Sequence, residues 1–387
     1  MIGKELPARP ILETQGADQG GKVAERSCLL ADLPLILIAW HTGMKIRVLG
    51  GTSMDSRSDD FPRLASTRFP KSMAFSITVA AVLIAISSQA QAILIIGPND
   101  SQGNPIGGQN TSAPTGALAN SGWQFEGLWQ GAFTGTPIAP NYFLSANHLG
   151  GNVGDTFAIN GQSYTTTAKF LDPSGGDLAL WQVNSTFASY APLYTGNEVG
   201  QTMITFGRGG PPGPSTTTDG VALSGWIWTS PLGGLSWGTN QVTSAGTIQG
   251  GPSGQYVFWA FDKTLGPNTG SLSPGDSGGG VFINVGGVWK LAGINFEATG
   301  PYNTHPGNAP STSFTASLYD SRGLYFDGDT TPITGSVPVP SIDVASRIST
   351  EAAWISGITG VAVPEPGSVV LLSAGLVLAL PLCRKSR

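Results

Sequence analysis

The chain has 387 residues, of which 55 are glycine and 28 proline, and only 11% are charged. So few charges exclude a chain kept disordered by self-repulsion, and so many turn-forming residues exclude an all-helical bundle. The formal net charge of −5 argues against a nucleic-acid partner, since such a partner requires a basic face.

The N-terminal part of the chain is typical of a targeting segment. An apolar run starts at Met73, follows basic residues and ends in the sequence AQA at 90–92. This pattern predicts a secretory signal over 73–92 that signal peptidase removes. A membrane span is the weaker alternative, because polar residues end the run too early. Since such signals act at the start of a chain, we expect 1–72 to be a mis-assigned start or an extension of the basic region, with translation beginning at Met54 or Met73.

The middle of the chain predicts short strands separated by turns. Five segments are apolar or alternating and are bounded by Gly, Pro, Asn or Asp: Trp123–Trp129, Tyr142–Ser145, Leu178–Val183, Gly279–Ile283 and Val288–Ile294. A Pro/Gly-rich loop is expected over 209–218 and a second long loop over 299–313. One helix is expected over 349–355, where a polar start precedes good helix formers. The prediction is an all-β body that closes on one C-terminal helix.

Residues 359–387 predict a second targeting segment. Pro364, Glu365 and Pro366 precede an apolar stretch over 367–382, and a basic tail follows. This pattern indicates a short transmembrane helix with a basic stop, below the roughly 20 residues of a comfortable span. The order of motif, helix and tail resembles the PEP-CTERM sorting signal of Gram-negative bacteria. The resemblance implies cleavage by an exosortase and export to the cell surface or extracellular matrix; a permanent C-terminal anchor is the alternative.

The chain left between these two segments is acidic and lacks cysteine. Over 93–362 six basic residues stand against fifteen acidic ones, a net charge of −9. Cys28 and Cys383 both lie in the predicted targeting ends. We therefore expect an exported domain whose stability comes from its core rather than from disulfides.

The sequence GDSGGG at 275–280 is the clearest chemical signal in the chain. A serine in a tight glycine turn is exposed as a nucleophile, and the neighbouring backbone N–H groups are free to form an oxyanion hole. Ser277 requires a base, and the chain between the targeting segments has only two histidines, His148 and His305. His305 is expected on a surface loop.

His148 follows the predicted apolar strand Tyr142–Ser145, and Asp177 directly precedes the predicted apolar strand Leu178–Val183. A carboxylate at the start of a buried strand is costly unless its charge is used, and orienting a histidine is such a use. Each residue by itself has a purely structural interpretation: His148 as a hydrogen-bonded structural histidine, Asp177 as a turn residue, and the segment around Ser277 as a glycine-rich turn. Their order, each at a strand end, favours a set in which His148 is the base, Asp177 the orienting carboxylate and Ser277 the nucleophile.

This order of residues resembles that of the trypsin/chymotrypsin-like serine peptidases. The resemblance rests on LSANH around His148, GGDLALWQV around Asp177, GDSGGG around Ser277 and ASRISTEAAWI at 345–355. It implies a peptidase domain over 93–358, made of two antiparallel six-stranded β-barrels with a C-terminal helix. It also implies hydrolysis of polypeptide substrates by the three residues, without a cofactor.

Two further features of the nucleophile loop follow from the resemblance. The N–H groups of Gly275 and Ser277 are expected to form the oxyanion hole. Asp276 is expected to stabilise the loop. In activated family members the corresponding residue pairs with a new N-terminal ammonium, and the sequence at 95–97 resembles that N-terminus except for Pro98, which follows it.

Five residues are expected at the specificity pocket. Loop counting places Ser271 at its base. Asn295, Phe296 and Glu297 are expected to form its wall and the strand that pairs with substrate, and Asp343 is expected near the opposite wall. The family usually has glycine where Glu297 stands, so a carboxylate there either narrows the pocket or attracts a basic substrate side chain. Asp343 adds to the attraction, which favours Lys or Arg before the scissile bond. The alternative is a Glu297 turned to solvent.

Three other functions compete with that of a peptidase. An α/β-hydrolase esterase also carries G-x-S-x-G, but its histidine follows the serine after several elements, and His305 is too close. Metal catalysis lacks the H-E-x-x-H motif, and the acidic segment 327–329 is read as a turn rather than a calcium site. A catalytically silent, peptidase-like binding or matrix protein at the cell surface stays open. We expect contact with membrane only through the signal and the C-terminal helix.

Overall fold

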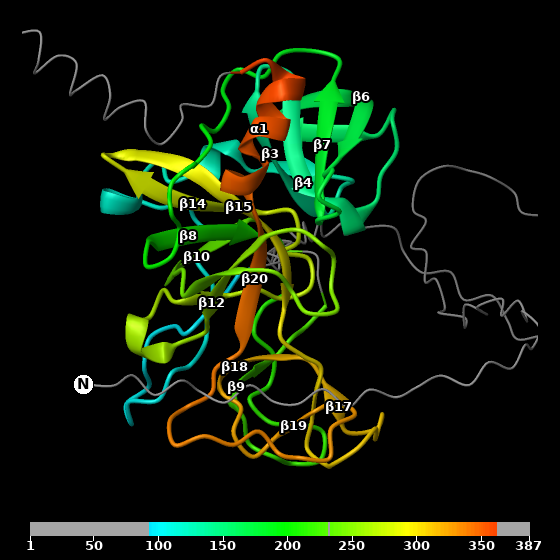
Figure 1. Ribbon diagram of the computed structural model, residues 1–387. Helices are drawn as coiled ribbons and strands as arrows, with labels where there is room; N and C mark the ends of the chain where they lie inside the picture. The colour runs from blue at the N-terminus through cyan, green and yellow to red at the C-terminus, as the bar shows by residue number, and fades with distance from the viewer. Residues whose placement is uncertain (1–92, 231–232, 362–387) are drawn as a thin grey trace, which may run out of the picture. The chain divides into compact units, whose positions relative to one another are not determined.

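The computed structural model of the protein describes residues 93–230 and 233–361 (Figure 1). The predicted upstream segment 1–72, the signal 73–92, the sorting motif at 364–366 and the apolar stretch 367–382 lie outside the described residues. Within the described ranges no helix is long and apolar enough to cross a membrane.

The described chain is built of short strands. They are β1 (Leu94–Ile95), β2 (Gly127–Trp129), β3 (Phe133–Ala139), β4 (Tyr142–Ala146), β5 (Thr156–Ile159), β6 (Gln162–Leu171), β7 (Leu178–Val183), β8 (Thr202–Gly207), β9 (Ser224–Ile227), β10 (Ser236–Gln241), β11 (Ser244–Gly246), β12 (Tyr256–Ala260), β13 (Gly270–Ser271), β14 (Gly280–Val285), β15 (Val288–Ala298), β16 (Tyr302–Asn303), β17 (Ser313–Phe314), β18 (Ala316–Asp320), β19 (Tyr325–Phe326) and β20 (Ile342–Arg347). The helices are η1 (Gly116–Leu118), η2 (Trp123–Phe125), η3 (Asn147–Leu149) and η4 (Lys263–Leu265), which are 3₁₀ turns, and α1 (Ile348–Thr359).

The first sheet is a closed barrel of β2, β3, β4, β7, β6 and β5, in that order. Fully buried aromatic side chains fill it. The rings of Phe143 and Phe157 stack with centroids 4.1 Å apart, and those of Trp129 and Trp181 lie 4.9 Å apart. Because the barrel has no free edge and a densely packed interior, it is a rigid base for the residues that follow its strands.

The second sheet has seven strands in the order β10, β8, β14, β15, β20, β12 and β11. It forms a half-barrel: within the described residues its hydrogen bonding does not close into a ring, and the three-residue strand β11 ends it at one edge. The prediction of an all-β fold with a barrel and a C-terminal helix is confirmed. The second expected barrel is this half-barrel, with seven strands where the prediction had six.

A single apolar cluster joins the barrel, the half-barrel and α1. Leu144 and Leu180 of the barrel belong to it, as do Phe282 of β14 and Ile348 and Ile355 of α1. Figure 1 accordingly shows α1 beside the barrel strands β4 and β7. The barrel and the half-barrel therefore share a core. This core fixes the end of β4, which precedes His148, relative to the start of β14, which follows Ser277.

The helix is longer than the sequence predicted. It runs from Ile348 to Thr359 rather than over 349–355, and Gly360 in the left-handed conformation (φ 69°) ends it. Glycine at this position costs no steric strain, so it is a common helix stop.

Most predicted strands are present, with two corrections. Leu178–Val183 matches β7 at both ends, while the expected strand over 123–129 begins as the 3₁₀ turn η2 and becomes a strand only at Gly127. The reason is that Gly122 (φ 135°) turns the chain, so that Trp123 packs against Phe206. The loop expected over 299–313 contains the short strand β16.

The sequence did not predict a small lobe beside the half-barrel. β9 pairs with β18, and β16 pairs with β17 and β19. All five strands have five residues or fewer, which is too short for a clear alternating pattern. The lobe matters for the site because Trp228 directly follows β9.

Candidate active site

The pairing of β4 with β7 brings His148 to Asp177. Ala146, the last residue of β4, lies opposite Leu178, the first residue of β7. In an antiparallel pair the residues just beyond these two ends meet. His148 Nδ1 lies 2.6 Å from Asp177 Oδ2, and the backbone N–H of His148 donates to Oδ1 of the same carboxylate over 2.7 Å. Two bonds thus fix both the ring and its backbone.

Ser277 reaches the same histidine from the half-barrel. It lies on the loop between β13 and β14, and its Oγ is 3.0 Å from His148 Nε2. The imidazole is 40% exposed, whereas the Asp177 side chain is only 5% exposed. When Nδ1 donates to the carboxylate, Nε2 is the acceptor for the serine O–H. The three residues predicted as a set therefore form one continuous hydrogen-bonded chain.

The turn at Ser277 requires glycine at the next position. Gly278 has φ +83°, and a Cβ there would lie 2.3 Å from the backbone oxygen of Thr134. A side chain is excluded both by the conformation and by the barrel backbone. The glycine run therefore allows the serine loop to press against the first barrel.

The backbone N–H groups of the loop divide into two kinds. Those of Asp276, Gly278 and Gly279 donate to Ser273 O, Asn295 O and Asp276 O. Within the described residues, the N–H groups of Gly275 and Ser277 donate to no protein group. Both N–H groups therefore have a free donor for an incoming oxygen atom. They belong to the two residues for which the sequence predicts an oxyanion hole, and that role stays a prediction.

Asp276 stabilises this loop as expected. Its carboxyl oxygens accept hydrogen bonds from the N–H of Gly209 (2.7 Å), the N–H of Ser273 (2.7 Å) and the hydroxyl of Ser273 (3.1 Å). Burial raises the pKa of Asp276 to about 7, against the opposing effect of these bonds. The segment 95–97 lies elsewhere, with Ile96 N–H bonded to Thr269 O. Among the described residues, Asp276 therefore pairs with the N–H groups of Gly209 and Ser273 and with the Ser273 hydroxyl.

Asn295 also holds the nucleophile loop. Its buried side-chain amide donates to Phe206 O (2.7 Å) and Asp276 O (3.2 Å) and accepts from the Thr205 hydroxyl (3.0 Å). Because a peptide unit is planar and trans, fixing the Asp276 carbonyl on one side directs the Ser277 N–H to the other side. Asn295 was expected to contact substrate; the structure instead buries its side chain behind the loop.

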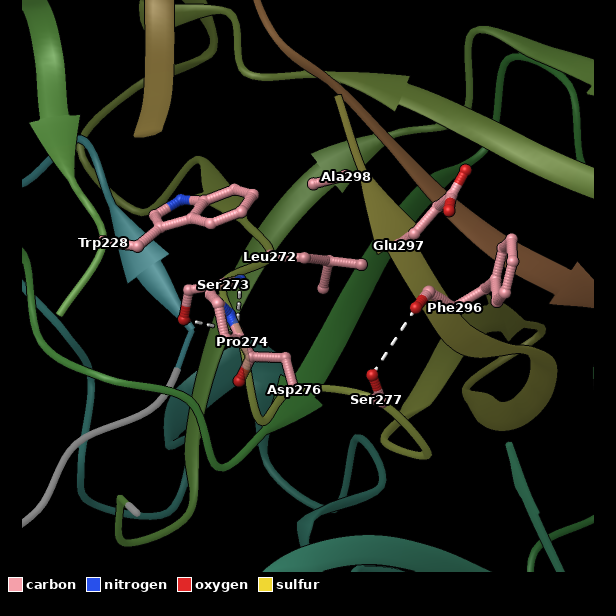
Figure 2. A pocket seen from close by; sticks show the side chains of 9 residues that line it. All are labelled: Trp228, Leu272, Ser273, Pro274, Asp276, Ser277, Phe296, Glu297 and Ala298. Carbon is pink, nitrogen blue, oxygen red and sulfur yellow. Dashed lines mark hydrogen bonds between the residues drawn. The ribbon is translucent and has the colours of Figure 1, made fainter. Parts of the chain in front are cut away.

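A mostly apolar pocket of about 200 Å³ opens beside Ser277 (Figure 2). The side chains that give it this character are Trp228, Leu272, Pro274, Phe296 and Ala298. Figure 2 shows Trp228 at the end opposite Phe296, with Leu272 between them.

Of the five residues expected at the pocket, Phe296 and Glu297 line it and Ser271, Asn295 and Asp343 do not. Ser271 and Asp343 are fully buried and bond each other, with 3.1 Å between Ser271 Oγ and Asp343 Oδ1. Asp343 also accepts from the N–H of Leu272 over 3.0 Å, and burial raises its pKa well above the usual range. Loop counting found the right segments, but these side chains turn away from the pocket into the interior.

Glu297 lines the pocket, but its carboxylate does not face the apolar side chains. The side chain is exposed, and Figure 2 shows the carboxylate pointing away from Leu272 and Trp228. Partial burial raises the pKa of Glu297, with Asp177 acting in the same direction and His148 against it. This orientation agrees with the alternative of a Glu297 turned to solvent.

Sequence reasoning missed the wall formed by Trp228, Leu272, Pro274 and Ala298. Leu272 and Pro274 directly precede the GDSGGG sequence at 275–280, so their position in the chain indicates that they lie near Ser277. Trp228 comes from the lobe, and only the aromatic residues of SGWIW at 224–228 marked that segment.

Glu126 is a second buried carboxyl group that the sequence did not single out. Its oxygens accept from the Thr136 hydroxyl and from the N–H of Gly280, each over 3.3 Å. Burial raises the pKa of Glu126 to about 8, and the Gly280 and Thr136 bonds and the charge of Arg208 oppose the increase only in part. The Glu126 carboxyl group therefore links the start of β2 to β14, the strand that follows the Ser277 loop.

The stability of the fold should fall at alkaline pH because of Glu126. A carboxyl group with a raised pKa stabilises the fold fully below its unfolded pKa, and this contribution is lost as pH rises through the folded value of about 8. Denaturant unfolding should show a free energy lower by a few kcal/mol at about pH 9 than at about pH 5. Glu126→Gln cannot ionise and should have a flatter profile, with a remaining slope from the buried carboxyl groups of Asp276 and Asp343. Equal slopes in the two proteins would show that Glu126 is not the group responsible.

His305 and the acidic segment 327–329, for which the sequence predicted no catalytic role, lie in the lobe. His305 is on a surface loop as expected, with its side chain 61% exposed and Nδ1 3.7 Å from Asp219 Oδ2. Asp327 and Gly328 form a turn. Across the described ranges, no group of three or more His, Cys, Asp or Glu side chains is placed to hold a metal ion.

In sequence comparisons no family model and no curated protein matches this chain. Solved structures do match. One is the Rv3671c protease in its inactive form, with 14% identity and a TM-score of 0.35 over 65% of this chain and 99% of that chain. Another is an inactive serine-to-alanine mutant of Rv3671c from M. tuberculosis H37Rv, with 15% identity and a TM-score of 0.35 over 66% of this chain and 99% of that chain. The function of this protein is therefore inferred from its own side-chain geometry.

Proposed function

We propose that the protein is an exported serine endopeptidase that hydrolyses peptide bonds through Ser277, His148 and Asp177. The observation that carries the proposal is the hydrogen-bonded chain from Asp177 Oδ2 through both ring nitrogens of His148 to Ser277 Oγ. Each member has the neighbour that nucleophilic catalysis requires: a base on the nucleophile and an orienting carboxylate on the base.

The mechanism is acyl transfer. Ser277 Oγ attacks the peptide carbonyl carbon while His148 Nε2 accepts its proton, and Asp177 stabilises the resulting imidazolium. The free N–H groups of Gly275 and Ser277 hold the negative charge that develops on the carbonyl oxygen. His148 then gives the proton to the leaving amine, and water releases the acyl group from Ser277 by the same steps in reverse roles.

Export and surface display are part of the proposal and rest on the sequence. The segment 73–92 has the pattern of a signal for signal peptidase. Pro364, Glu365 and Pro366 with the stretch that follows support processing by an exosortase and retention at the surface of a Gram-negative bacterium.

Digestion of an unfolded polypeptide tests the activity. The full chain should generate new peptide ends, detected by mass spectrometry, and pretreatment with a serine-directed sulfonyl fluoride should abolish the cleavage. Cleavage that resists the reagent would contradict the Ser277 mechanism. No cleavage at all would favour the alternative of a catalytically silent binding protein.

A further inference from the structure

We infer that the pocket beside Ser277 receives an uncharged apolar side chain of the size of Leu, Met or Phe, and that Trp228 sets this limit. The inference rests on the proposed function and specifies its substrate class. It replaces the preference for Lys or Arg that the sequence favoured.

The pocket is positioned to hold the side chain next to the attacked carbonyl. Ser277 itself lines it, together with the residues on either side: Leu272 and Pro274 before the nucleophile, and Phe296 and Ala298 on β15. A substrate carbonyl at Ser277 Oγ therefore places the adjacent side chain between these two walls (Figure 2).

The volume and lining of the pocket define the size class. Its volume is about 200 Å³. An apolar cavity of about 150 Å³ is large enough to hold benzene, so a phenyl ring or a branched aliphatic chain fits this pocket. Burial of such a group stabilises the complex by about 25 cal/mol for each Å² of apolar surface removed from water.

Trp228 is a fixed end wall rather than a movable side chain. Its indole N–H donates to Ser317 Oγ over 2.8 Å, and its backbone N–H donates to Thr315 O over 3.0 Å. Ser317 is fully buried on β18 and also bonds to Ser271 Oγ over 2.9 Å. A network that joins the lobe to β13 thus holds the indole in place.

The acidic side chains near the pocket are not placed to pair with a basic substrate side chain. Asp276 and Asp343 are fully buried; both oxygens of Asp276 and Oδ1 of Asp343 accept hydrogen bonds from the protein, and Asp343 does not line the pocket. The Glu297 side chain is exposed, and its carboxylate points away from Leu272. A cation at the Trp228 end would lose its hydration without gaining a carboxylate partner, which is costly.

A peptide library with every residue before the scissile bond tests the inference. The full chain should cleave after Leu, Met or Phe at least about tenfold faster than after Lys or Arg, since even one methylene group in such a pocket changes rates by about that factor. Trp228→Ala should enlarge the pocket and raise cleavage after Trp relative to Leu by about tenfold. Trp228→Phe keeps an aromatic wall and should give a smaller shift in the same direction, which provides a test if the alanine variant does not fold.

Three results of this experiment would contradict the inference, and they are distinguishable. Preference for Lys or Arg in the unaltered protein, reduced by Glu297→Gln, would assign the pocket to basic side chains and overturn the inference while leaving the peptidase intact. An unchanged preference in folded Trp228→Ala and Trp228→Phe would remove Trp228 as the limit. Absence of cleavage of every peptide would overturn the proposed function and the inference with it.

Discussion

Exchanging Ser277 for Ala should lower kcat by about a million-fold while leaving KM nearly unchanged. The substitution removes the nucleophile, whereas the pocket, the free N–H groups of Gly275 and Ser277 and the His148–Asp177 bond remain. Those groups bind substrate about as well before and after the change. The loss should therefore appear in kcat, measured in the steady state with a peptide amide.

Ser163→Ala is the matched control for this prediction. Ser163 is an exposed serine on β6 of the barrel and takes no part in the site. Its replacement should leave kcat and KM at the level of the unaltered protein. A Ser277→Ala protein that is folded and retains more than about a thousandth of the activity would require another nucleophile.

Replacing Gly279 with Ala should have the largest effect on stability, a loss of about 3 kcal/mol or more. A Cβ at this position would lie 1.9 Å from the backbone oxygen of Phe206 and 3.0 Å from the side-chain nitrogen of Asn295. Neither neighbour can give way easily: Phe206 lies on β8, and the Asn295 amide is held by its own hydrogen bonds. Thermal unfolding should shift downward by about 10 °C, at roughly 2–4 °C per kcal/mol for a domain of this size.

Gly357→Ala is the contrasting substitution. Gly357 is exposed within α1, and an added Cβ there meets no atom within 4 Å. Alanine costs less conformational entropy in a helix, so this variant should be more stable by about 0.5–1 kcal/mol. A Gly279→Ala protein that unfolds at the same temperature as the unaltered one would show that β8 and the loop are not in rigid contact.

The three central residues were predictable because each is marked by local sequence. His148 and Asp177 sit at the ends of apolar strands, and Ser277 sits in a glycine run. Residues at the ends of neighbouring strands often lie close together. The register of β4 and β7 brings His148 and Asp177 together in this way. The closing helix was predictable for the same reason, since helix formers follow a polar start at 349–355.

The pocket was less predictable because side-chain direction depends on tertiary contacts. Counting along the chain identified the segments that hold Ser271, Asn295 and Asp343, but an alternating strand has two faces and the count does not choose between them. Trp228 lies some fifty residues before Ser277 in sequence and reaches the pocket only because β9 pairs with β18. That long-range pairing of short strands has no signature in a single sequence.

Labelling with a fluorophosphonate probe tests most directly whether Ser277 is an activated nucleophile. The reagent phosphonylates a serine whose hydroxyl is activated by a neighbouring base, and peptide mapping by mass spectrometry locates the adduct. We predict one adduct on Ser277 of the full chain, no adduct in Ser277→Ala and a normal adduct in Ser163→Ala. Absence of label in the folded, unaltered protein, or label that persists in Ser277→Ala, would contradict the assignment of Ser277 as the nucleophile of a serine peptidase.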